Sequence, residues 1–147
     1  MENYQISNFL AALRKIILRR AWFPVMIFFI HVVCSRLIRV YDLFPPLDIP
    51  MHIAGGFAIA YFFSGSLRAL EEYKLLHPLE HLLEDILVFT LTCTAAIFWE
   101  FLEYISDHWI KTHAQPGLED TLLDLLMGIA GVVLYIITQK IQPLERR

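Results

Sequence analysis

The sequence predicts an all-α, polytopic membrane protein with four transmembrane helices and an N-terminal amphipathic helix at the membrane interface. Hydrophobic residues make up 57% of the 147 positions and charged residues 18%, whereas an ordinary soluble domain has about 25% charged residues. The mean hydropathy is +0.54, which also excludes a disordered chain. Four apolar runs each approach the roughly 20 residues that a helix needs to cross a bilayer core. These predicted spans are residues 21–40, 49–70, 86–105 and 121–139.

The segment before the first span predicts a helix that lies on the membrane surface. Within residues 4–20, apolar side chains recur at spacings of three and four, and four basic side chains lie on or beside the polar face. The first apolar run has no small-x-small site after it, so we expect it to remain as a helix rather than to be cleaved as a signal peptide. A second surface segment is expected over residues 71–85, bent near Pro78. At this length, residues 1–147 are predicted to form a single membrane domain.

A soluble four-helix bundle is the competing fold. The helices of such a bundle should carry polar faces at helical period, but residues 57–63 are apolar all the way round a helix. The net charge of −3 leaves no basic surface able to follow a phosphate backbone, which excludes nucleic acid as a partner. Cys34 and Cys93 both lie inside apolar runs, so we interpret them as packing residues rather than as a disulfide or metal ligands.

The distribution of lysine and arginine predicts the orientation of the chain. Nine of these residues lie in the N-terminal segment, the connection after the second span and the C-terminal tail, against three (Arg36, Arg39 and Lys111) on the other side. By the positive-inside rule, both termini are expected in the cytoplasm, with the protein as a multi-pass component of the inner (cytoplasmic) membrane.

Acidic residues gather at the predicted outer ends of three spans. Each group has a spacing of three or four residues, which places its members on one side of a helix. The second span opens with Asp48 and His52, the third ends with Glu100, Glu103 and Asp107, and the fourth opens with Asp120 and Asp124. Gly128 and Gly131 follow on the fourth span and should allow close approach of a neighbouring helix.

This acidic cluster predicts a bound divalent metal ion. Carboxylates at membrane depth cost about 3 kcal/mol each on insertion scales unless they are paired, protonated or metal-bound. Oxygen-rich clusters with an occasional imidazole suit several divalent ions, and the sequence does not choose among them. Acidic stripes on neighbouring helices also resemble the construction of di-metal carboxylate bundles. The predicted metal ligands are Asp48, His52, Glu100, Glu103, Asp120 and Asp124.

Plainer interpretations exist for some of these residues. Asp48 and Asp120 stand where a helix N-cap or a first-turn acid is common, and these interpretations have about the same weight as metal binding. His52 taken alone is more often a hydrogen-bonded core histidine than a metal ligand. For the acids further inside apolar sequence, where no cap is available, the alternative is ion pairing with Arg36 and Arg39.

Three short motifs carry a resemblance to known membrane proteins. The segments DIPMHIAGGFAIA, WEFLEYISD and EDTLLDLLMGIAG, between Asp48 and Gly131, resemble in their order the motifs of YjdF-type predicted inner-membrane proteins and, more distantly, of the VanZ-like family. The resemblance implies a small polytopic membrane protein, and VanZ-like members are linked to glycopeptide resistance. VanZ-like proteins tend to carry a glutamine where this chain has Glu103, and an arginine between the positions of Asp107 and Asp120 where this chain has none. The acidic cluster of this chain therefore carries more negative charge, which favours cation binding over a role in glycopeptide resistance.

Three functions are compatible with this pattern. The first is a metal-dependent hydrolase or transferase that acts on a lipid-linked or phosphorylated substrate, with Glu103 and Asp107 as catalytic residues and Arg36 and Arg39 as the substrate-binding bases. The second is a cation or proton transporter or sensor, which at four helices should need to form a homo-oligomer. The third is a non-catalytic accessory or scaffold protein of the membrane. The lipid bilayer is a partner in all three.

Overall fold

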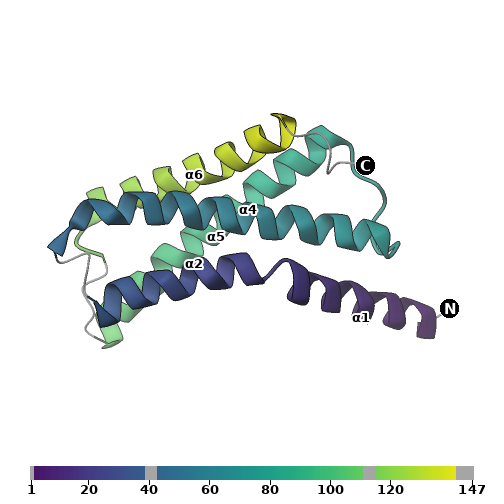
Figure 1. Cartoon of the computed structure of the whole chain (residues 1–147), viewed down its shortest axis with the longest axis horizontal. Helices are drawn as coiled ribbons and strands as arrows, with labels where there is room; N and C mark the ends of the chain where they lie inside the picture. The colour runs from purple at the N-terminus through teal and green to yellow at the C-terminus, as the bar shows by residue number, and fades with distance from the viewer. Residues whose placement is uncertain (1, 39–42, 111–114, 142–147) are drawn as a thin grey trace.

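The computed structural model describes residues 2–38, 43–110 and 115–141, and over these ranges every regular element is helical (Figure 1). This confirms the predicted all-α class. The elements are α1 (Glu2–Arg19), α2 (Trp22–Val32), the π-helical turn η1 (Val33–Leu37), the 3-10 turn η2 (Pro45–Leu47), α4 (Asp48–Glu72), α5 (His81–Ile110) and α6 (Leu118–Ile141).

Three helices are each long and apolar enough to cross a membrane. They are the segment Pro45–Glu72, which contains α4, together with α5 and α6. The first predicted span differs, because α2 has 11 residues and η1 only five more. The segments Tyr4–Arg19 and Trp22–Ser35 pass the same test only as a pair, bent by 43°. The described residues thus contain three helices able to cross a membrane, or four candidate spans if this bent pair counts as one.

Helix α4 is the centre of the bundle and packs against α1, α2, α5 and α6. Its closest neighbour is α6, because glycines remove the side chains where the two backbones cross. A Cβ atom on Gly56 would lie 2.1 Å from the carbonyl oxygen of Gly128, and one on Gly131 would lie 2.2 Å from that of Ile53. Further along α4 and α6 from this crossing, Ala60, Val132 and Tyr135 form the buried core together with Val88 of α5. The predicted close approach at Gly128 and Gly131 is confirmed.

The connection between α4 and α5 is a turn rather than a second surface helix. Helix α4 continues to Glu72 and α5 begins at His81, so seven of residues 71–85 belong to these two helices and residues 73–80 form a non-helical connection. Lys74 has a left-handed backbone (φ 58°), and Pro78 cannot donate a helical hydrogen bond. The Leu79 N–H instead donates to the Glu71 carboxylate at 2.7 Å. The expectation of a second amphipathic helix over residues 71–85, bent near Pro78, was therefore wrong.

The antiparallel order of α4, α5 and α6 brings three chain segments to one end of the bundle (Figure 1). These segments are the start of α4, the end of α5 and the start of α6. At this end α5 also exposes large apolar side chains, among them Phe98 and Phe101. Such exposure fits a helix surrounded by lipid, since apolar side chains need no protein cover in a bilayer.

Candidate metal site

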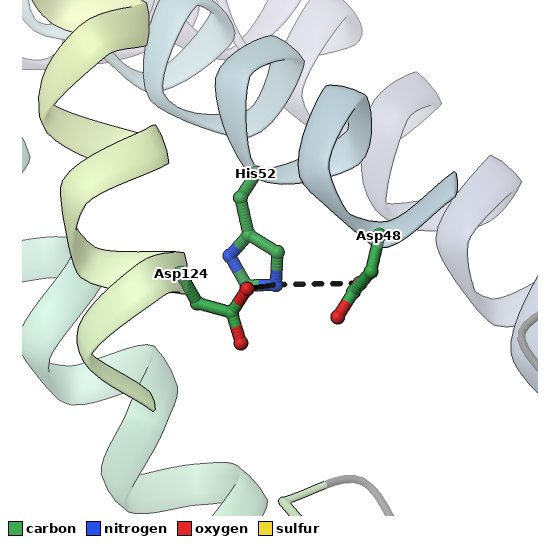
Figure 2. A group of neighbouring side chains, drawn as sticks. All are labelled: Asp48, His52 and Asp124. Atoms are coloured by element: carbon green, nitrogen blue, oxygen red, sulfur yellow. Dashed lines mark ion pairs between the residues drawn. The ribbon is translucent and has the colours of Figure 1, made fainter. Parts of the chain in front are cut away.

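His52 lies between two carboxylates at this end of the bundle. Its Nε2 atom is 3.5 Å from Asp48 Oδ1, one turn earlier on α4, and 3.5 Å from Asp124 Oδ1 on α6. Figure 2 shows the imidazole between the two acids. Asp124 is only 3% exposed, because the α4–α6 crossing lies one turn further along its helix. These three residues form one group able to hold a metal ion.

Asp124 also belongs to a second group of possible metal ligands. Glu100 and Glu103 on α5 are 4% and 7% exposed, and together with Asp124 they form a second set of three neighbouring ligands. The indole Nε1–H of Trp99 donates to Glu103 Oε1 at 2.8 Å. This hydrogen bond leaves the other carboxylate oxygen of Glu103 available to a ligand.

The ligand atoms of each group fit around a divalent ion. In both groups one atom from each residue lies within 4.8 Å of the others. Ligands on opposite sides of an ion are about 4.2 Å apart for Mg²⁺ and about 4.8 Å apart for Ca²⁺, since the bonds are about 2.1 and 2.4 Å long. The donor set of carboxylates and one imidazole also suits Mn²⁺, Fe²⁺ or Zn²⁺. Asp124 is the residue that both groups share, so it could contribute a ligand to either.

The structure distinguishes the two aspartates that stand near helix starts. The N-cap of α4 is Leu47, so Asp48 is not a cap and its side chain faces His52 instead. Asp120 lies in the first turn of α6, where an acid is favoured by the helix dipole. It belongs to neither ligand group, yet its Oδ2 atom is buried and makes no hydrogen bond within the described part of the chain.

Asp107 has a partner in the connection to α6. Its Oδ2 atom accepts a hydrogen bond from the Gln115 N–H at 2.9 Å, and the Gln115 side chain donates to Glu100 Oε2 at 3.4 Å. Asp107 is in neither ligand group, and its catalytic role stays a prediction. Sequence reasoning missed Gln115, because a lone amide in a loop has no spacing that could have marked it.

The predicted substrate-binding bases are not placed. Arg39 and Lys111 lie outside the described residues, and so does the side chain of Arg36. Whether the arginines pair with the acids therefore stays open as well. Among the described residues of this cluster, His52 forms ion pairs with Asp48 and Asp124.

A second polar cluster, which sequence reasoning also missed, lies at the opposite end of the bundle. Glu84 on α5 accepts hydrogen bonds from Arg68 Nε at 2.9 Å and from Ser64 Oγ at 3.0 Å, both on α4. Arg68 also donates to Gln139 on α6 at 3.4 Å. The spacing of Ser64 and Arg68, one helical turn apart, could have indicated a shared partner.

Comparisons with known proteins agree with a membrane protein. A protein of Thermotoga maritima described as uncharacterized is 27% identical over 109 residues, which cover 70% of this chain and 52% of the relative. The chain thus spans about half the length of this relative. No solved structure matches the chain significantly. The VanZ-like resemblance is not shown by these matches, whereas the YjdF-type resemblance is consistent with them, because the family model that matches is that of the YjdF family. This model, described as "Predicted membrane protein (DUF2238)", covers residues 9–143, so the chain belongs to the DUF2238 family.

Proposed function

We propose that this protein binds a divalent metal ion at the end of its helical bundle and uses it to hydrolyse or transfer part of a lipid-linked or phosphorylated substrate. The observation that carries the proposal is the buried carboxylate of Asp124, which belongs to two ligand groups from three helices. The proposed ligands are Asp48, His52, Glu100, Glu103 and Asp124.

The charge balance of the site supports a bound cation. Glu100, Glu103 and Asp124 are all buried, and carboxylates so close together repel one another. His52 is the one imidazole in the two groups, and a single positive charge does not neutralise three buried acids. A divalent ion would offset the remaining charge and satisfy the free carboxylate oxygens.

The chemistry of the site follows from this ligand set. A divalent ion held there would polarise a phosphoryl oxygen or make a bound water more acidic. Asp107, one turn beyond Glu103, is assigned as the proton acceptor. The Trp99 indole orients the carboxylate of Glu103 as a metal ligand. Arg36 and Arg39 are assigned to the anionic part of the substrate.

Metal analysis of purified protein tests the proposal. Protein purified in detergent without chelators is expected to contain close to one or two equivalents of a divalent metal, measured by elemental analysis. Asp124→Asn should lose it, because both ligand groups lose their shared carboxylate. The matched control is Glu119→Gln, an exposed acid on the same helix outside both groups, which should retain the metal. A folded wild-type protein that stays empty after reloading with Mn²⁺, Zn²⁺ and Mg²⁺ would contradict the proposal.

A second candidate function is cation transport, favoured by the polar cluster around Glu84 at the opposite end of the bundle. Thr92 is buried on α5, eight residues from both Glu84 and Glu100, so a polar group lies between the two ends. Proteoliposomes that contain this protein alone should then take up Mn²⁺ in a fluorescence-quenching assay, and Glu84→Gln should slow uptake. Liposomes that take up no ion would leave the enzyme proposal in place and remove this one.

A further inference from the structure

An apolar cavity of about 160 Å³ lies among α2, α4 and α5 and reaches Gly128 of α6. Small side chains create the space, since Gly55 on α4 and Ala95 and Ala96 on α5 all border it. Its polar border includes His52 and Glu100, so the cavity leads into the proposed metal site. Apolar walls with a few polar groups at one end are typical of a site for an amphiphilic small molecule.

A buried hydroxyl in the cavity wall lacks a partner. Thr92 is 1% exposed and borders the cavity, and its Oγ1 atom makes no hydrogen bond within the described residues. Thr90 and Thr94, on the same helix, both donate to the carbonyl four residues earlier, at 2.7 and 2.9 Å. Thr92 therefore departs from the usual way in which a helical threonine is satisfied in an apolar environment. A buried unsatisfied hydroxyl costs free energy, which a ligand with an oxygen acceptor would recover.

The cavity has the position and size of a binding site for a hydrocarbon chain. Two of its walls, α4 and α5, are helices able to cross a membrane, so the surrounding solvent is itself hydrocarbon. The rings of Phe28 and His31 on α2 meet Trp99 on α5 at 5.9 and 5.3 Å, near the polar end. An engineered apolar cavity of about 150 Å³ holds a benzene molecule, so this cavity has room for roughly six chain carbons.

We propose that the cavity binds one acyl chain of an ester lipid, with the lipid headgroup at the acidic cluster and an ester oxygen as the acceptor for the Thr92 hydroxyl. This inference rests on the proposed function and names the substrate class of that site. A soluble phosphorylated compound would leave the apolar walls and Thr92 without a partner, whereas a lipid fills the cavity along its whole length. The bilayer supplies such molecules directly to helices that span it.

A substitution at Gly55 tests the inference without disturbing the backbone. A Cβ atom built on Gly55 meets no other atom within 4 Å, so the side chain of Gly55→Leu would enter the cavity and take the space of the acyl chain. Replacing glycine in a helix also favours the helical state. The matched control is Thr94→Leu, which adds similar bulk at an exposed position outside the cavity.

Lipid retention is measured by native mass spectrometry of detergent-purified protein incubated with dioleoylphosphatidylglycerol and then diluted into lipid-free detergent. The wild type and Thr94→Leu are expected to retain one lipid. Gly55→Leu should retain about tenfold less, because about two methylene groups lose their contacts, and Thr92→Val should also retain less. If Gly55→Leu retains as much lipid as the wild type, or the wild type retains none, the inference is overturned.

Asp124→Asn separates this inference from the proposed function. This variant should lose the metal and still retain the lipid through its acyl chain, because Asp124 does not border the cavity that holds the chain. Lipid retained by a wild-type protein that never binds metal would support the cavity as a lipid site and contradict the metal proposal. Metal bound by a protein that retains no lipid would support the metal proposal and contradict the cavity as a lipid site.

Discussion

At the scale of single residues, the hydrogen bond from Trp99 to Glu103 should matter most for the proposed metal site after the proposed ligands themselves. A ligand carboxylate held by a second residue is oriented for its ion, and loss of such a partner commonly lowers metal affinity by about 10- to 100-fold. Trp99→Phe keeps an aromatic ring against Phe28 and His31 but removes the N–H donor. We expect metal affinity to fall roughly tenfold, less than for Asp124→Asn, in a titration against a fluorescent chelator.

The control for this prediction is another tryptophan on the same helix. Trp109 is 79% exposed, so Trp109→Phe should leave metal affinity unchanged. If Trp99→Phe binds metal as tightly as the wild type while Asp124→Asn does not, then Trp99 serves packing alone. An effect of Trp99 on metal affinity through the orientation of the Glu103 carboxylate would then be excluded.

The sequence predicted pairs of site residues better than it predicted their shared partners. Asp48 and His52, four residues apart, face one another as their spacing requires, and Glu100 and Glu103 also share a helix face. No spacing could show that Asp124 belongs to both groups, because this depends on how α6 is rotated against α4 and α5. Asp120 has the same sequence signature and lies in neither group.

At the scale of helices, the crossing of α4 and α6 sets the distance between His52 and Asp124. Gly→Ala in a helix ordinarily stabilises by about 1 kcal/mol, but at Gly131 the new methyl group would lie 2.2 Å from the Ile53 carbonyl oxygen. The two helices would have to separate, and such overpacking costs about 1–3 kcal/mol. Gly131→Ala is therefore expected to lower the unfolding temperature in detergent and to weaken metal binding.

Gly55 provides the matched control for the helix crossing. A methyl group there meets no atom within 4 Å, so Gly55→Ala should keep or raise the unfolding temperature measured by differential scanning fluorimetry. Equal stability of Gly131→Ala and the wild type would show that the α4–α6 contact is looser than the crossing geometry requires.

Helix positions were more predictable than helix connections. Long apolar runs locate α4, α5 and α6, since their length is set by the thickness of the bilayer. The first span was harder to predict. The residues that form α1 and α2 differ in polarity, which indicates two separate segments, whereas the two helices pass the test for a membrane span only as one bent pair. The segment at 71–85 has helical periodicity, but the left-handed Lys74 and Pro78 interrupt it.

At the scale of the whole molecule, the polar groups divide between the two ends of the bundle. The cluster of Asp48, His52 and Asp124 lies at one end and that of Arg68 and Glu84 at the other. A membrane that contains α4, α5 and α6 therefore has one cluster near each surface. The side on which the proposed metal site lies follows from the orientation of the chain alone.

The excess of basic residues predicts that orientation. Nine of the twelve lysines and arginines lie within residues 14–20, 68–74 and 140–147, so the end of the bundle opposite the acidic cluster should face the cytoplasm. In a background with Cys34 and Cys93 replaced by alanine, Glu119→Cys is expected to react with a membrane-impermeant maleimide in right-side-out vesicles. Glu80→Cys, in the connection at the other end, should react only after the membrane is permeabilised. The reverse labelling pattern would place the metal site on the cytoplasmic side with its ligand geometry unchanged, because both ligand groups depend on the helix crossing and not on the direction in which the bundle is inserted.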